Sequence, residues 1–115
     1  MVEASRAVGP WREAVRAETQ RVMGSAAPLA GPVSVRIGFW LPRPRSLPKS
    51  VLWPAKRPDL DKLTRAVLDG LTDGGAWGDD GQVVSLLASK EFAGQDPAGC
   101  WVQIYLMPEI GKERS

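Results

Sequence analysis

The chain of 115 residues has a formal net charge of +2 and is 43% apolar, which suits one domain with a modest core. It has no histidine and one cysteine, Cys100. Ser-His-Asp and Cys-His nucleophilic sites, His-ligated zinc and an internal disulfide are therefore excluded. An enzyme built on this chain must use other side chains, and carboxylates that hold a hard cation, Mg²⁺ or alternatively Mn²⁺, fit best.

Three further features concern location and charge. No segment approaches the roughly 20 apolar residues of a membrane span, and the first residues lack the apolar segment of a secretory signal. With its single cysteine, the chain is expected to be cytoplasmic, with no membrane contact. Residues 1–57 hold ten Lys/Arg against three Asp/Glu, whereas residues 58–115 hold five against ten. A nuclease would need such a basic surface and acidic cluster, although this asymmetry alone commonly serves only solvation.

The first half of the chain predicts a helix, a strand and a basic loop. Gly9-Pro10 opens a helix that ends near Gly24, with Trp11, Ala14, Val15 and Val22 on its apolar face. Residues 33–41 alternate between apolar and polar positions, which is typical of a half-buried strand. Residues 42–58 contain five prolines and several Lys/Arg, which predicts an exposed loop.

The second half predicts a helix and two strands. Leu60, Leu63, Val67 and Leu71 form the apolar stripe of a helix over 60–71, followed by a turn over 72–75. Residues 82–92 and 101–106 are expected to be strands joined as a hairpin by the turn over 94–99. The order predicts an α+β fold in which a small mixed β-sheet is combined with two α-helices, as a single domain over residues 1–115.

Two acidic segments carry the chemistry. Asp59 and Asp61 stand at the start of the second helix, and Asp79-Asp80 precede the next strand about 20 residues later. A structural interpretation exists for each: an Asp at a helix start caps it, Asp-Gly forms turns, and Asp61 could pair with Arg65 one turn later. If the intervening helix folds back, however, the carboxylates of the two segments converge.

The combination resembles the RusA family of Holliday junction resolvases. The resemblance is carried by P-D-L-D-K-L-x-R-A-V-L-D-G-L over 58–71, W-G-D-D-G-Q-V-V over 77–84 and Lys90, and it extends over roughly residues 10–108. It implies that Asp59, Asp61 and Asp80 are catalytic acids that bind Mg²⁺, with Mn²⁺ as an alternative. It also implies that a basic residue at position 65 assists catalysis.

The chemistry that the resemblance implies is coherent. Carboxylate-held Mg²⁺ keeps water positions open, so that the ion can activate a water and offset the charge of the scissile phosphate. Arg65 would stabilise the charge that develops in the transition state. We expect further basic residues to hold the DNA backbone without reading its sequence. These DNA-binding candidates are Arg43, Arg45, Lys49, Lys56, Arg57, Lys62 and Lys90.

The chain departs from the family at two places. The family usually has Lys where this chain has Arg65, and Arg is permanently protonated, which argues against a proton-transfer role. The family also begins with an apolar strand before the first helix. Met1–Val8 does not resemble such a strand, and we expect this N-terminal strand to be missing. Either the true start lies upstream or the sheet lacks one edge.

The function predicted is a Mg²⁺-dependent endodeoxyribonuclease that resolves four-way DNA junctions by paired symmetric nicks in recombination and repair. Because such a junction has approximate two-fold symmetry, we expect a homodimer. Trp40, Trp53 and Trp77 are candidate exposed aromatics for its interface, although packing in the core is the safer expectation for any one of them. Two alternatives remain: a nuclease of broader specificity for branched DNA, and a catalytically silent DNA-binding or assembly module of a mobile element. A carboxylate-pair glycosidase is disfavoured by the short chain.

Overall fold

The computed structural model describes residues 8–94 and 97–108. In chain order its elements are α1 (Val8–Met23), β1 (Val33–Leu41), α2 (Leu60–Asp73), the 3₁₀-helix η2 (Asp80–Gln82), β2 (Val83–Phe92) and β3 (Gly99–Leu106). The sequence-based prediction of an α+β fold with two helices and a small mixed sheet is confirmed. The expectation about Met1–Val8 falls almost entirely outside the described residues.

Strand β1 is the centre of a three-stranded sheet with the order β2-β1-β3. It pairs in parallel with β2 and antiparallel with β3. The alternating residues of β1 that face the helices are almost completely buried: Val33, Val35, Ile37, Phe39 and Leu41. The single buried apolar face is what the alternation of residues 33–41 predicts, whereas the pairing on both edges is seen only in the folded chain.

The predicted hairpin of the last two strands is wrong, because β1 lies between β2 and β3. Directly after β2, the backbone N–H of Ala93 donates a 2.7 Å hydrogen bond to the carbonyl of Leu41 at the end of β1. Spanning two inter-strand gaps needs only about 10 Å. A six-residue connection therefore reaches the second neighbour as easily as the first.

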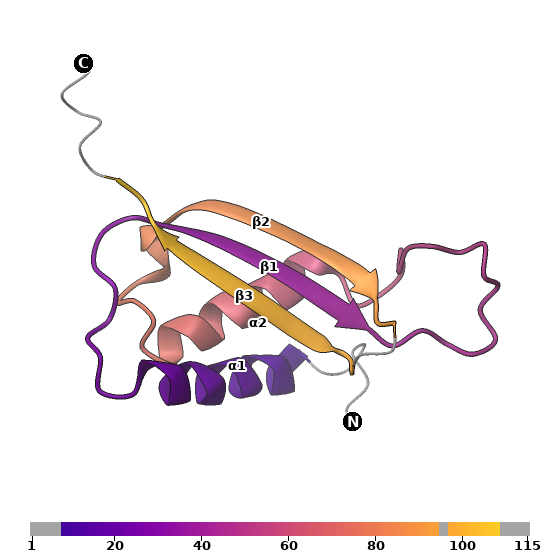
Figure 1. Cartoon of the computed structure of the whole chain (residues 1–115), viewed down its shortest axis with the longest axis horizontal. Coiled ribbons are helices and arrows are strands. Elements are labelled where there is room, and N and C mark those ends of the chain that lie inside the picture. The colour runs from indigo at the N-terminus through magenta and orange to yellow at the C-terminus, as the bar shows by residue number, and fades with distance from the viewer. Residues whose placement is uncertain (1–7, 95–96, 109–115) are drawn as a thin grey trace, which may run out of the picture.

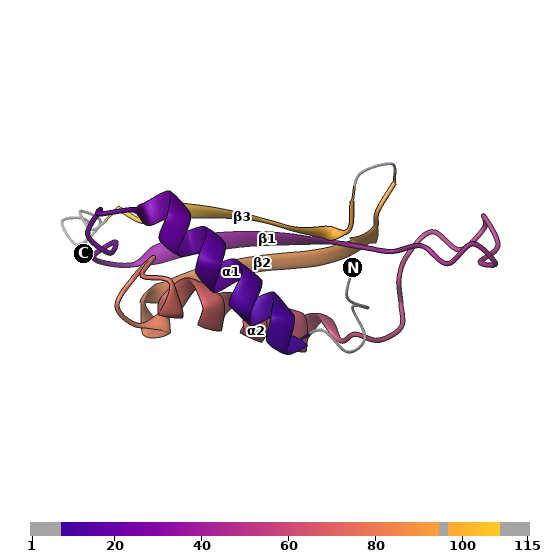
Figure 2. The same ribbon diagram turned by 90° about the horizontal axis from the view of Figure 1, so that it is seen from below.

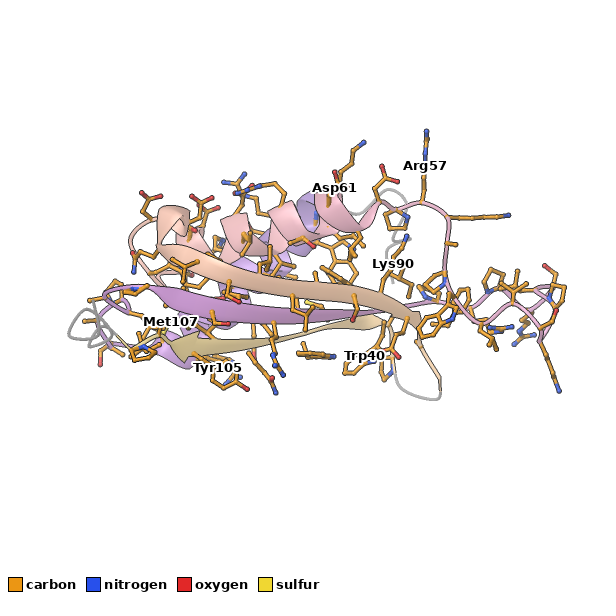
Figure 3. All side chains as sticks on the ribbon, turned by 90° about the horizontal axis from the view of Figure 1, so that it is seen from above. Trp40, Arg57, Asp61, Lys90, Tyr105 and Met107 are labelled. Carbon is orange, nitrogen blue, oxygen red and sulfur yellow. The ribbon has the colours of Figure 1, made fainter. Side chains whose placement is uncertain are left out.

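Both helices cover one face of the sheet (Figures 1 and 2), and the other face is open. The strand register places Arg36, Trp40, Leu87, Trp101 and Tyr105 on the open face. Trp40 and Tyr105 point away from the helices in Figure 3. The indole of Trp101 lies over Gly38, where a Cβ would meet its Nε1 at 2.2 Å. A glycine at position 38 therefore makes room for this ring.

Helix α2 provides most of the helical part of the core. Its buried residues are Leu63, Thr64, Ala66, Val67, Leu68, Gly70 and Leu71. Helix α1 crosses α2 closely at Gly70 and Gly74, where an added Cβ would lie 2.6 Å from the Arg12 carbonyl oxygen and from Thr19 Cβ, respectively. The two glycines thus allow the backbones to approach, which a larger residue would prevent.

The buried stripe of α1 differs from the predicted one. Val15 and Thr19 are buried, Trp11 packs edge-on against Phe39 with ring centroids 5.4 Å apart, and Val22 is 66% exposed. The hydroxyl of Thr19 donates a 2.6 Å hydrogen bond to the carbonyl of Val15, which allows this polar side chain to be buried. Thr19 thus takes the place in the core that was expected for Val22. Within the part of the chain that is described, no helix is long and apolar enough to cross a membrane.

Candidate active site

The first acidic segment forms the N-terminus of α2. Asp59 is the N-cap residue, but its carboxylate makes no capping hydrogen bond. Asp61 Oδ1 accepts a 2.9 Å hydrogen bond from the backbone N–H of Lys62, and both aspartates are exposed. Asp59 does not act as a side-chain cap, contrary to the structural interpretation of the sequence.

Lys90 of β2 positions this segment. Its Nζ donates hydrogen bonds of 2.6 Å to the carbonyl of Lys56 and 2.8 Å to the carbonyl of Pro58, the residue before Asp59. Figure 3 places Lys90 between the sheet and the segment that carries Arg57 and leads to Asp61. The ammonium group predicted to contact DNA is thus bound to backbone carbonyls on the approach to α2.

The second acidic segment is a turn that its own side chains hold in place. Asp79 accepts a 3.1 Å hydrogen bond from the backbone N–H of Gly81 and forms a capping box with Gln82. The Gln82 side-chain oxygen accepts from the N–H groups of Gly78 and Asp79, and its amide nitrogen donates to the carbonyls of Leu29 and Gly31. Gln82 therefore fixes the turn against the segment before β1. The D-x-x-Q spacing is the sequence signal that could have revealed this role.

The two aspartates of this turn, Asp79 and Asp80, have different hydrogen-bond partners. The Asp79 carboxylate is occupied by the cap, whereas Asp80 Oδ2 accepts a 2.6 Å hydrogen bond from Nη1 of Arg65. The same guanidinium lies 3.5 Å from Asp69 Oδ1. The hydrogen bond to Asp80 is the main cause that raises the pKa of Arg65 above its ordinary value, and Asp69 adds to it. Arg65 thus pairs with Asp80 and Asp69, and the Asp61–Arg65 ion pair of the structural interpretation does not occur in this structure.

A shallow pocket of about 310 Å³ opens beside this pair. It is lined by Arg65, Leu68, Asp80, Val83, Val84, Ser85 and Leu86. The register between β1 and β2 shifts at this point, where Ser34 pairs with Ser85 and Val84 is left over. Such bulges commonly re-aim side chains beside functional sites. Asp69 is a residue of this site that the acidic motifs did not single out, although its position four residues after Arg65 on a helix is the signal for that pair.

The donor set suits a hard divalent cation, because Asp59, Asp61 and Asp80 offer carboxylate oxygens only. Over residues 8–94 and 97–108, however, no group of three or more metal-binding side chains lies close enough to hold an ion. Arg65 is bonded to Asp80, and carboxylates without a cation between them repel one another. The structure brings Asp80 to the face of α2 that carries Arg65, without gathering the three acids into one cluster.

The predicted DNA-binding residues fall into two groups. Arg43 donates from its two terminal nitrogens to the carbonyls of Val51 and Pro48, and Lys90 is likewise bound to carbonyls. The exposed remainder are Arg45, Lys49, Lys56, Arg57 and Lys62. Of these, Lys62 lies 4.0 Å from Asp59. Two of the predicted contacts thus support the loop, and five remain on the surface.

The three tryptophans considered for a dimer interface differ in their exposure. Trp77 is only 1% exposed and donates from Nε1 to the Thr72 hydroxyl at 2.8 Å, so it is not an exposed interface residue, and the alternative of packing in the core is confirmed for it. Trp40 is half-buried on the open face of the sheet. Trp53 is 63% exposed in the loop before α2. Only Trp53 is fully available at the surface among these three.

A family of known proteins matches most of the chain. The family described as endodeoxyribonuclease RusA matches residues 3–105 of the 115-residue chain. A search of curated proteins gives no significant match. The family match spans both acidic segments, Arg65 and Lys90. The chain therefore belongs to the RusA family of endodeoxyribonucleases.

Proposed function

We propose that the protein is a Mg²⁺-dependent, structure-selective endodeoxyribonuclease that resolves Holliday junctions by paired symmetric nicks during recombination and repair. The observation that carries the proposal is the Arg65–Asp80 hydrogen bond of 2.6 Å, which ties the second acidic segment to α2, the helix that begins with the first acidic segment. Membership of an endodeoxyribonuclease family supports phosphodiester hydrolysis in DNA as the reaction.

In this proposal Asp59, Asp61 and Asp80 would hold the divalent ion, which would supply an activated water and offset charge on the scissile phosphate. Arg65 binds the phosphate and stabilises the charge of the transition state. Because a guanidinium stays protonated, Arg65 transfers no proton. Lys90 and Gln82 act as positioning residues through the carbonyls and N–H groups that they hold.

The direct test offers the protein a four-way junction, a flap and plain duplex, each with Mg²⁺, with Mn²⁺ and with a chelator. We expect symmetric nicks in the junction alone, and only with a divalent cation. Equal cutting of flap and junction would favour the nuclease of broader specificity. Junction binding without cleavage under every metal condition would favour the silent DNA-binding module instead.

We further propose that the protein acts as a homodimer in the cytoplasm. A groove of about 600 Å³ between α1 and β3 is lined mainly by apolar residues, among them Ala14, Val22, Val102 and Ile104. An isologous dimer could bury such a surface and present two equivalent sites to a two-fold symmetric junction. Val22→Glu should dissociate the dimer in light scattering, whereas Ala17→Glu, on the exposed side of the same helix, should not. A monomeric wild-type protein at micromolar concentration would contradict this part.

A further inference from the structure

The connection between β1 and α2, residues 42–58, forms an arm that projects beyond the ends of the strands (Figure 1). Two successive turns shape it, closed by hydrogen bonds of 3.1 Å from Leu47 N to the Pro44 carbonyl and 3.0 Å from Val51 N to the Pro48 carbonyl. Its prolines fix φ and restrict the backbone before any ligand binds. The arm is thus a shaped element, although it contains neither helix nor strand.

Two cations brace this arm from the sheet side. The Arg43 guanidinium donates to the carbonyls of Val51 at 2.8 Å and Pro48 at 2.7 Å, and it lies 4.9 Å from the ring centre of Phe92 at the end of β2. Lys90 holds the carbonyls of Lys56 and Pro58 on the returning half. Hydrogen bonds from Arg43 and Lys90 therefore hold both the outgoing and the returning halves of the arm in place, which preorganises the surface between these two halves.

A groove of about 530 Å³ lies between the two halves of the arm and the end of the sheet. Its apolar lining includes Leu41, Leu47, Val51, Trp53 and Phe92, and Lys56 and Arg57 also line it. Its volume lies in the range of small-ligand sites. Trp53 nevertheless keeps 63% of its surface exposed. An exposed indole that lines a braced groove offers a flat aromatic face to a ligand.

The chemistry of the lining identifies the class of ligand. Within the described part of the chain, no carboxylate lines the groove, while two cations do. Aromatic rings bind unstacked nucleobases by stacking, and lysine and arginine bind the adjoining phosphates. Arg57 also lies only two residues before Asp59, so the groove adjoins the first acidic segment. A nucleobase in the groove would thus be linked by its own backbone to a phosphate near the candidate active site.

We propose that this groove is a subsite for an unstacked nucleobase at the branch point of the DNA substrate, with Trp53 as the stacking surface and Lys56 and Arg57 as phosphate contacts. The proposal rests on the nuclease function proposed above. Bases at a branch point are easier to unstack than bases in continuous duplex. The subsite therefore favours branched over plain DNA without reading sequence.

The experiment places the fluorescent base 2-aminopurine at the branch point of a four-way junction and, as a comparison, in the middle of one arm. Binding is measured without divalent cation, so that no cleavage occurs. With the wild-type protein we expect a fluorescence change for the branch-point probe only. Trp53→Ala should abolish this change and weaken junction binding roughly 5- to 150-fold, as the loss of one stacked base does. Trp53→Phe should retain most of both signals.

Leu52→Ala is the matched control, because Leu52 is 70% exposed in the same arm but does not line the groove. It should bind the junction with wild-type affinity and give the same fluorescence change as the wild type. Thermal unfolding of each variant checks that the fold is intact. If the wild type binds and cuts junctions while Trp53→Ala matches it in affinity and fluorescence, the subsite is overturned and the nuclease function stands. If the wild type neither binds nor cuts any DNA, both fail. A Trp53→Ala variant that changes only the oligomeric state would assign the groove to a protein partner and also overturn the subsite.

Discussion

Arg65 Nη1 donates a 2.6 Å hydrogen bond to Asp80 Oδ2 and so connects the middle of α2 with the turn before β2. Two segments that are separate in sequence meet through this bond, and Asp61 lies one helical turn before Arg65 on the same helix. The guanidinium of Arg65 compensates the charge of Asp80, and it also lies 3.5 Å from Asp69. The pair thus defines where the catalytic centre should assemble.

Asp61→Asn and Asp80→Asn should each abolish cleavage in Mg²⁺, because the amide cannot replace a charged ligand of the ion. Each change is nearly isosteric and removes at most one exposed ion pair, so stability should fall by only about 0.2–1 kcal/mol. Junction binding should persist or tighten as repulsion of the phosphates declines. The measurements are nicking assays, binding assays and thermal unfolding.

Asp73→Asn is the control for these variants, since Asp73 also lies in α2 but pairs with Arg12 at 2.8 Å, away from the site. It should cut at the wild-type rate. Wild-type cleavage by Asp80→Asn in Mg²⁺ would refute the assignment of the metal-binding acids.

Arg65→Lys should remain active, and Arg65→Ala should cut about 10²–10³-fold more slowly, the usual effect of losing one transition-state contact. Since Asp80 raises the pKa of Arg65, the guanidinium stays charged at every working pH. The pH profile of cleavage in the wild type should therefore show no step from residue 65. Single-turnover rates from pH 6 to 9 provide the measurement, and equal rates for Arg65→Ala and wild type would exclude a catalytic role.

Lys90→Met should lower cleavage by loosening the segment that carries Asp59, and it should raise the Mg²⁺ concentration for half-maximal activity. Because its ammonium is bound to the carbonyls of Lys56 and Pro58, the salt dependence of DNA binding should stay unchanged. Lys49→Met, on the exposed arm, should do the reverse and reduce the salt slope by about one unit. A reduced slope for Lys90→Met would make it a DNA contact.

The double charge reversal Arg45→Glu with Lys49→Glu should weaken junction binding and flatten its salt slope by at least about two units, since each lost contact removes nearly one released counterion. Arg43→Met should act differently, because Arg43 braces the arm through Val51 and Pro48. It should increase protease cleavage within residues 42–58. Titrations at several salt concentrations and limited proteolysis measure the two effects, and an unchanged slope in the double variant would place the DNA surface elsewhere.

Burial raises the pKa of the Cys100 thiol to about 11, because the thiolate is disfavoured in the groove between α1 and β3. Alkylation at pH 8 should be roughly 10- to 100-fold slower than in the unfolded chain. The raised value means that burial of the thiol stabilises the fold below the unfolded pKa of about 9, and that this contribution is lost as the pH rises towards 11. Equal alkylation rates in the native protein and in urea would contradict this burial.

Several features of the fold and of the site were predictable from the sequence because they depend on local periodicity. The alternation in residues 33–41 gave the correct bounds of β1, and the apolar stripe from Leu60 to Leu71 identified α2, although the helix extends to Asp73. The positions of Asp59 and Asp61 at the start of a helix follow from the same pattern. A regular backbone repeats every 2 or 3.6 residues, so the sequence itself records which face is buried.

The partners of these elements depended on contacts between distant residues, which no local period records. Three features are of this kind. Strand β1 lies between β2 and β3, Trp77 is buried with its Nε1 bonded to the Thr72 hydroxyl, and Arg65 pairs with Asp80. The helical spacing alone would have paired Arg65 with Asp61. Arg43 and Lys90 also look like surface cations in the sequence, and only the folded chain supplies the carbonyls that bind them. Composition and periodicity determined the class of fold and the chemistry available to the site, whereas tertiary packing decided which charges meet, because a long side chain can reach any of several partners.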